Sequence, residues 1–370
     1  MKQIYLDNAA TTPVRKEVVT AMTDVMLKQY GNPSSPHALG EQALELITDA
    51  RKKVASVIKA KPAEIVFTSG ATEANALALF GLAGMYPGKK RIVISAFEHS
   101  SVYAVCEMLK GRGYEIVEVP VTYEGMIAMK VLEQAITTDT LVVSVIPGHN
   151  ELGVVQDIQA IASLCTRTNV FFHTDAVQSF GKVPIDVRWG IDLVSASAHK
   201  IGGSKGVGCL YVRSGIQLKP LLPGSQELGR RGGTENVPGI VGFGKAVECA
   251  QKVNWGEVMK LRMWFERELE KLNGIITCKA SPRLPGHVHV AFPGQDAEQL
   301  VVALSEKGIY CSARSACLTK QHTENRTLKA MGMSSALQKG SVRFVLGRDT
   351  TKSDLKQVMR IVRQLLNIKK

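Results

Sequence analysis

The chain has 370 residues, more than twice the length of an average domain, so we expect one large domain and a smaller one. Hydrophobic residues make up 45% of the sequence and charged residues 21%, without repeats or low-complexity tracts, which excludes a disordered chain or a solenoid. The formal net charge is +13, but the basic residues are spread along the chain without interleaved aromatic residues, so we expect no direct nucleic-acid binding.

The N-terminal residues contain no apolar run of the kind found in signal peptides or membrane spans, so we expect a cytoplasmic protein. The seven cysteines are odd in number and widely scattered. This pattern argues against a disulfide framework and indicates reduced thiols, one of which is a candidate reactive group.

Short apolar runs alternate with helical patterns in the first two thirds of the chain, at residues 64–68, 91–95, 115–119, 141–145, 170–173 and 193–196. This alternation predicts a mostly parallel sheet covered by helices on both faces. Ligands of such sheets bind beyond the carboxyl ends of the strands. We therefore expect one edge of the sheet to carry residues 69–72, His99, Asn150, Asp175 and Lys200, since each follows a predicted strand closely.

The pattern changes after a long helical stretch at residues 237–272. It continues with a strand at residues 288–292, a helix at 297–307, a polar stretch, a second strand at 341–345 and a final helix at 351–370. This order predicts a smaller α+β domain. We place the large domain at residues 14–250 and the small domain at residues 1–13 and 251–370.

Lys200 and Asp175 suggest a particular cofactor. A lysine at a strand end, shielded from water, can have a lowered pKa and form a Schiff base with an aldehyde. Pyridoxal phosphate needs such a lysine and a carboxylate on its pyridinium nitrogen. A lone lysine is a weak signal because most lysines are surface charges, but Asp175 upstream supplies the second group.

Residues 68–75 form a glycine turn between a strand and a helix, where free N–H groups and the helix dipole favour a phosphate. The same turn can also be a simple helix N-cap. Residues 202–208 lack the Walker spacing and a following helix, which disfavours a nucleotide-binding enzyme. His99 is placed to stack on a cofactor ring and move protons, although a lone histidine there is more often an N-cap.

Cys317 is the candidate nucleophile, because its neighbours resemble a core less than those of the other cysteines do. It precedes a polar stretch without periodicity, which is typical of an exposed loop. Cys311 lies at a strand end. Together with His322, these two cysteines have a spacing that matches no common zinc site, so we expect no metal.

Taken together, these segments resemble the NifS/IscS-like cysteine desulfurases, members of the class V aminotransferase group. The resemblance spans nearly the whole chain and rests on residues 5–13, 31–35, 69–73, 98–99, 150–153, 173–178, 197–200, 231–236, 315–317 and 341–344. It implies the α/β fold of type I pyridoxal-phosphate-dependent transferases. It also implies that the protein removes sulfur from L-cysteine, giving L-alanine and a persulfide on Cys317.

The resemblance further implies a role for each matched residue. Lys200 would hold the cofactor and move the substrate Cα proton, and His99 would stack on the ring as acid and base. Asn150 and Arg343 would bind the substrate carboxylate, a task suited to a planar guanidinium. The remaining cofactor contacts would come from Asp175 on the ring nitrogen, Gln178 on the phenolic oxygen, and Ala71, Thr72, Ser197, His199 and Thr234 of the partner subunit on the phosphate.

This arrangement implies a homodimer. The 26 residues from Cys317 to Arg343 resemble the longer loop of group I enzymes, so an Fe–S cluster scaffold is the expected sulfur acceptor, with tRNA thiolation or cofactor pathways as alternatives. The chain departs from the family pattern at Pro147, His149, Pro223 and Leu228. These departures bear on substrate fit and rate more than on the type of reaction.

Other functions stay open at this point. A selenocysteine lyase or another class V aminotransferase-type enzyme would share the fold, but a transaminase has no need of Cys317. A non-catalytic sulfur-transfer scaffold would not need the set formed by Lys200, Asp175, His99, Arg343 and Cys317.

Overall fold

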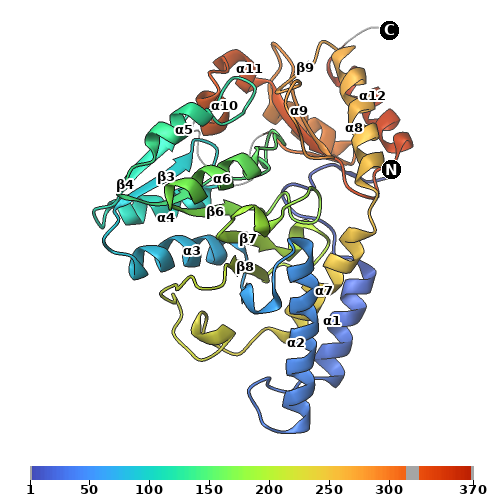
Figure 1. Ribbon diagram of the computed structural model, residues 1–370. Coiled ribbons are helices and arrows are strands. Elements are labelled where there is room, and N and C mark those ends of the chain that lie inside the picture. The colour runs from blue at the N-terminus through green and yellow to red at the C-terminus, as the bar shows by residue number, and fades with distance from the viewer. Residues whose placement is uncertain (1, 314–324, 368–370) are drawn as a thin grey trace.

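The computed structural model describes residues 2–313 and 325–367, and its centre is a seven-stranded sheet (Figure 1). The spatial order is β2 (Ile65–Thr68), β8 (Gly208–Val212), β7 (Leu193–Ser197), β6 (Phe171–Asp175), β5 (Thr140–Ser144), β3 (Arg91–Ser95) and β4 (Glu115–Val119). β8 is antiparallel to both of its neighbours, and the other neighbouring strands are parallel. The predicted mostly parallel sheet is confirmed.

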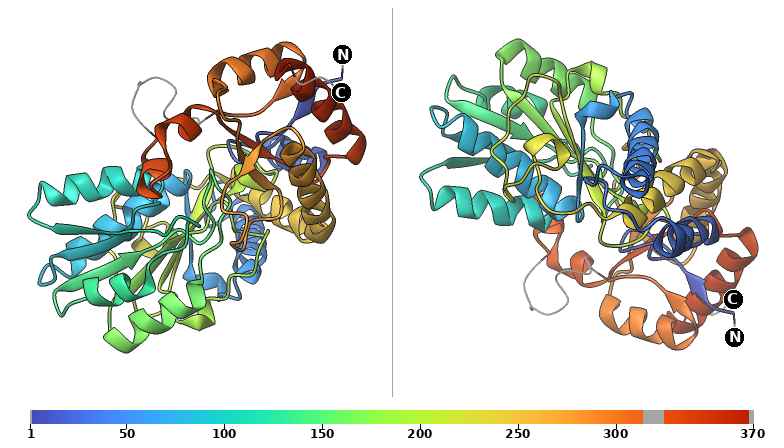
Figure 2. Two further views of the ribbon diagram at one scale, coloured as in Figure 1. Left: turned by 90° about the horizontal axis from the view of Figure 1, so that it is seen from above. Right: turned by 90° about the horizontal axis from the view of Figure 1, so that it is seen from below.

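Helices cover both faces of this sheet, as Figure 2 shows from above and below. One apolar core lies under α3 (Ala71–Met85) and α4 (Ser100–Lys110). The other core lies on the opposite face, under α1 (Lys16–Lys28), α2 (Ala38–Val57), α5 (Met129–Ala135), α6 (Ile158–Thr168) and α7 (Val237–Gln251). Because both faces are covered, strands such as β5, β7 and β8 are buried at every residue.

The remaining elements form a smaller unit at the top of Figure 1. Its antiparallel sheet has the order β12 (Ser341–Val345), β10 (His287–Ala291) and β9 (Ile275–Ile276). β1 (Ile4–Tyr5) pairs in parallel with β11 (Ile309–Tyr310). The helices are α8 (Trp255–Glu270), α9 (Ala297–Glu306), α10 (Arg326–Ala330), α11 (Ser335–Lys339) and α12 (Lys352–Leu365).

One apolar cluster unites this smaller unit, and it includes Ile4 and Leu6 from the N-terminal segment. α12 begins at a capping box in which Thr351 and Asp354 exchange hydrogen bonds. Among the described residues, no helix has both the length and the apolar character needed to span a membrane. The domain boundaries given above stay a prediction.

Some elements differ from the sequence prediction. The single helical stretch expected at residues 237–272 is two helices, α7 and α8, because the Asn254 side chain accepts from the Glu257 N–H and caps a new helix. The polar stretch after residue 324 contains the short helices α10 and α11, whose five residues each are too few to show a helical period.

Candidate active site

A cavity of about 610 Å³ opens at the carboxyl ends of the parallel strands. It brings together nearly all predicted site residues: Ala71, Thr72, His99, Asn150, Asp175, Gln178, Ser197, His199, Lys200 and Arg343. Thr234 is exposed and lies outside the lining of this cavity. Cys317 lies outside the described residues.

Lys200 ends a short 3-10 turn (Ala198–Lys200) that follows β7. Its Nζ donates to the carbonyl oxygens of Ala9 at 2.5 Å and Ala10 at 2.8 Å. These carbonyls belong to the N-terminal segment, which crosses from the small sheet to the large one. The amine is therefore held at the cavity by neutral acceptors of the backbone.

Asp175 ends β6 and is only 2% exposed. Its Oδ2 accepts from Asn75 Nδ2 at 2.8 Å, and its Oδ1 accepts from the Val177 N–H at 3.1 Å. Among the described residues, no basic side chain lies within ion-pair distance of this carboxylate. A buried carboxylate that has only neutral donors suits a cationic ring N–H, which fits pyridoxal phosphate.

Asn75 was missed at the level of sequence. It lies on α3, is fully buried, and also donates to Ser101 Oγ at 2.9 Å. The available signal was an amide within the otherwise apolar residues 74–83, where a polar side chain needs a partner. The amide links the carboxylate of Asp175 to the turn that holds His99.

The turn before α3 fits a phosphate. Gly70 is the N-cap of this 15-residue helix, and no atom lies within 4 Å of the place where a Cβ would stand. The first helical turn, with its free N–H groups and the positive end of the helix dipole, lines the cavity through Ala71 and Thr72. Thr72, Ser197 and His199 line the same cavity, as do Lys205 and Gly206, which the sequence did not indicate.

Two histidines, His199 and His99, line the cavity, and their surroundings determine where each ring carries protons. Burial and the nearby charge of Lys200 lower the pKa of His199 to about 4, so its ring is neutral near pH 7. His99 is the N-cap of α4, and its Nδ1 accepts from the Ser101 N–H. It is thus both an N-cap and a cavity residue. A neutral His99 ring consequently carries its proton on Nε2.

Arg343 on β12 is 3% exposed and reaches the cavity from the small unit. Its Nη2 bonds Asp7 Oδ1 at 2.7 Å, its Nη1 donates to the Asn150 carbonyl oxygen at 3.1 Å, and its Nε is buried without a partner. The Asp7 contact fixes the side chain, and a guanidinium so fixed can present its other donors to a carboxylate.

His149, one of the departures from the family pattern, is buried beside Asn150. Its Nδ1 accepts from the N–H groups of Glu151 and Leu152, and its ring lies 4.7 Å from that of Phe97. Burial lowers its pKa to about 3. The residue is therefore a neutral acceptor that shapes the turn carrying Asn150.

The segment that contains Cys317 is anchored at both ends. Before it, the backbone of Ser312 exchanges two hydrogen bonds with that of Arg343. After it, Asn325 Nδ2 donates to Glu151 Oε2 at 2.7 Å, and Arg326 lies 3.7 Å from the Tyr103 ring. Arg326 also lines the cavity, so both described ends of this segment lie at the candidate site.

Glu98 is a buried carboxyl group at the cavity. Its Oε1 accepts from Ser95 Oγ and from the Ile146 N–H, whereas its Oε2 has no partner. Burial raises its pKa from 4.5 to about 8, with a further contribution from the charge of Asp175. Glu98 is therefore protonated in the folded protein near neutral pH.

We expect Glu98→Gln to change the pH dependence of stability. Between pH 4.5 and about 8 the folded state holds a proton that the unfolded state has released, so the free energy of unfolding falls as pH rises. The contribution of Glu98 to stability is complete below pH 4.5 and is lost as pH rises through about 8. The neutral amide of the variant has no such proton to release, so its stability does not fall in this way. Relative to the parent, the variant should therefore gain a few kcal/mol in free energy of unfolding between these pH values, as urea titrations would measure. Identical pH profiles would contradict the protonated state of Glu98.

Comparison with known proteins agrees with this geometry. The family model described as aminotransferase class-V matches residues 4–358. A protein named cysteine desulfurase IscS from Dictyoglomus turgidum is 40% identical, over 99% of this chain and 95% of its own. A solved structure named NIFS-like protein has a TM-score of 0.93 at 33% identity, covering 100% of both chains.

A second solved structure, titled SspA in complex with cysteine, has a TM-score of 0.86 at 35% identity, covering 95% of this chain and 100% of its own. The matches extend over both the large sheet and the smaller unit. The chain therefore belongs to the aminotransferase class-V family and, within it, to the pyridoxal-phosphate-dependent cysteine desulfurases.

Proposed function

We propose that the cavity at Lys200 binds L-cysteine and that its sulfur passes to Cys317, with release of L-alanine. The observation that carries this proposal is that the cofactor residues, Lys200 and Asp175, share one cavity with the carboxylate-binding candidate Arg343. A cysteine ligand in a solved relative that covers nearly the whole chain supports the choice of substrate.

Pyridoxal phosphate, when bound, supplies an electron sink for negative charge at the substrate Cα. Asp175 would hold the ring nitrogen and stabilise its positive charge. Gln178 donates one N–H to the Ala9 carbonyl oxygen, and its second N–H is available to an anionic oxygen. Lys200 and His99 are the groups that move protons, at Nζ and Nε2 respectively.

Cys317 receives the sulfur in this proposal. Its thiolate forms an S–S bond with the substrate sulfur as the substrate Cβ–S bond breaks, and the electron pair of that bond stays on the carbon skeleton. Protonation of this skeleton gives alanine. Ser312, five residues before Cys317, exchanges backbone hydrogen bonds with Arg343, which lines the cavity.

A direct test is to mix the cofactor-loaded protein with L-cysteine. We expect a change in the visible absorbance, alanine in the solution and a protein-bound persulfide that maps to Cys317 by mass spectrometry. Keto-acid formation without sulfur release would instead indicate a transaminase. Equal turnover of selenocysteine, measured as selenide, would broaden the activity to that of a selenocysteine lyase.

Arg343→Ala should mainly raise the KM for L-cysteine, because it removes a guanidinium from the substrate carboxylate. Losing a charge-assisted hydrogen bond of this kind weakens binding by roughly tenfold or more. Steady-state kinetics would measure it, with Arg326→Ala, which removes another guanidinium from the cavity lining, as the control. An unchanged KM in Arg343→Ala would remove this residue from the substrate site.

The protein is proposed to act as a homodimer in which Thr234 contacts the partner's cofactor phosphate. Exposed apolar side chains on and after α1, including Met26, Leu27 and Tyr30, support burial against a second copy. Sedimentation of the loaded protein would reveal the dimer. The Fe–S scaffold as sulfur acceptor and the cytoplasmic location stay predictions.

A further inference from the structure

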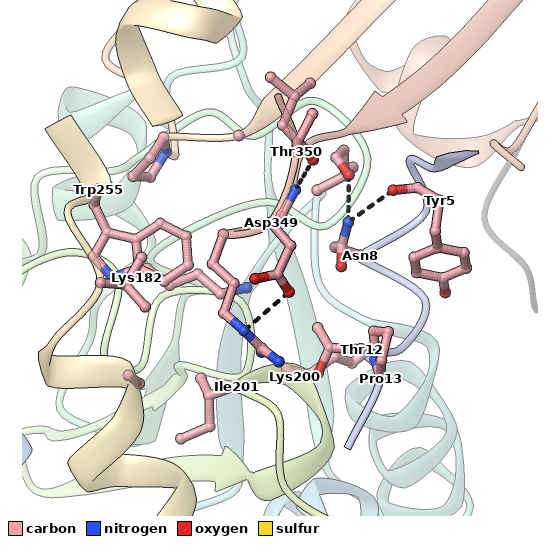
Figure 3. Close-up of a pocket in the computed structure, with 18 of the residues that line it drawn as sticks. Tyr5, Asn8, Thr12, Pro13, Lys182, Lys200, Ile201, Trp255, Asp349 and Thr350 are labelled. Carbon is pink, nitrogen blue, oxygen red and sulfur yellow. Dashed lines mark hydrogen bonds and ion pairs between the residues drawn. The ribbon is translucent and has the colours of Figure 1, made fainter. Parts of the chain in front are cut away.

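A second cavity, of about 250 Å³, lies between the two parts of the molecule (Figure 3). Lys200 lines both this cavity and the candidate active site. The walls come from the N-terminal segment, from the large unit through Lys182 and Ile201, from α8 through Trp255, and from the turn after β12. Nothing in the proposed reaction uses this space.

Positive charge is concentrated around this cavity. Its basic lining residues are Lys2, Arg15, Lys182, Lys200 and Arg348, against two acidic ones, Asp349 and Asp354. Both carboxylates are already paired: Asp354 lies 2.5 Å from Lys2 Nζ, and Asp349 lies 3.1 Å from Arg348 Nε. Among the residues that the structure describes, none places a carboxylate within 4 Å of Arg15 or Lys182.

The two arginines converge over Gly202. A Cβ at Gly202 would lie 2.9 Å from Arg348 Nη1 and 3.2 Å from Arg15 Nε, so the glycine leaves room for both side chains. Arg15 Nε is buried and has no hydrogen-bond partner. Burial and the charge of Arg15 lower the pKa of Arg348. Two guanidinium groups this close repel each other, and an anion between them would relieve the repulsion.

The rest of the lining is mainly apolar and well fixed. Trp255 Nε1 donates to the Gly181 carbonyl oxygen at 2.9 Å, which holds the indole against the cavity. Ala250, Val253, Pro285 and Leu346 complete this side. A dry cavity of about 150 Å³ can hold a benzene ring, so the present volume can hold a ring with a short charged chain.

We propose that this cavity binds a small organic carboxylate with an apolar body. The carboxylate lies between Arg15 and Arg348, and the apolar body lies against Trp255. Such a ligand contacts both parts of the molecule and the residue that holds the cofactor.

The test is calorimetry on the cofactor-loaded protein, with 3-phenylpropionate as the probe and 3-phenylpropionamide as its uncharged match. We expect one probe molecule to bind per chain. The amide should bind at least about tenfold more weakly, because it lacks the charge. Arg15→Gln and Arg348→Gln should each weaken probe binding by about tenfold. Lys16→Gln removes an exposed charge next to Arg15 and should leave probe binding unchanged.

The candidate active site also offers a guanidinium, so the experiment must separate the two cavities. Saturating L-cysteine should leave the probe stoichiometry unchanged, and Arg343→Gln should retain the probe. Competition with L-cysteine, or loss of binding in Arg343→Gln alone, would overturn the proposal. So would an affinity equal to that of the parent protein in both arginine variants, or no heat from the parent protein at millimolar probe. If Arg15→Gln does not fold, Arg348→Gln decides.

Discussion

Replacing Lys200 with alanine is expected to abolish the visible absorbance of a lysine-bound cofactor and to lower turnover of L-cysteine by about a thousandfold or more. The variant removes both the covalent anchor and the amine that moves the Cα proton. The side chain donates to two backbone carbonyl oxygens and is not part of the apolar core, so the fold should persist. Absorbance spectra and alanine release measure the two effects.

Lys182 is the matched control, because it is a partly buried lysine whose charge interacts with that of Lys200. Burial and the charge of Lys200 lower its pKa to about 7, so it also has a reactive free-amine form near neutral pH. It lines the second cavity and not the first. Lys182→Ala should therefore keep the absorbance band. A band that survives in Lys200→Ala and disappears in Lys182→Ala would move the anchor to Lys182.

Cys317→Ser is expected to keep cofactor absorbance and L-cysteine binding but to form no persulfide, with sulfide release lowered by at least about a hundredfold. A serine hydroxyl at neutral pH is a far weaker nucleophile toward sulfur than a thiolate. Mass spectrometry after a single turnover measures the persulfide. Unchanged sulfide release, without an added thiol, would exclude Cys317 as the acceptor.

Cys311→Ala is the control for this variant. Each of the other six cysteines is buried, and burial raises the pKa of Cys311 in particular. A buried thiol of this kind acts as a small apolar side chain and stays protonated. Its removal should lower stability slightly and leave persulfide formation intact.

The sequence predicted the strands of the large sheet well, because residues covered on both faces form nearly continuous apolar runs such as 141–145. It did not single out β8, whose antiparallel direction leaves no mark in composition. It also did not indicate α1 and α2, which lie before the first strand of the alternation. Their packing against α7 joins segments some 200 residues apart.

The candidate site was predictable to the extent that its residues follow strand ends or match family motifs. Lys200, Asp175, His99 and Arg343 do line one cavity. Their partners were not predictable, because the carbonyls of Ala9 and Ala10 carry no side-chain signal. The contact of Asp7 with Arg343 joins residues 336 positions apart in the sequence. The roles of these residues stay predictions.

The N-terminal segment has a practical consequence for handling the protein. Within a few residues it pairs with β11, holds Arg343 through Asp7 and contacts Lys200 through two carbonyl oxygens. Proteolytic clipping before Thr12 would therefore remove supports of both cofactor and substrate while sparing the large core. A preparation clipped in this way would look intact by size yet lose its yellow colour, and an affinity tag fused close to Lys2 risks the same loss.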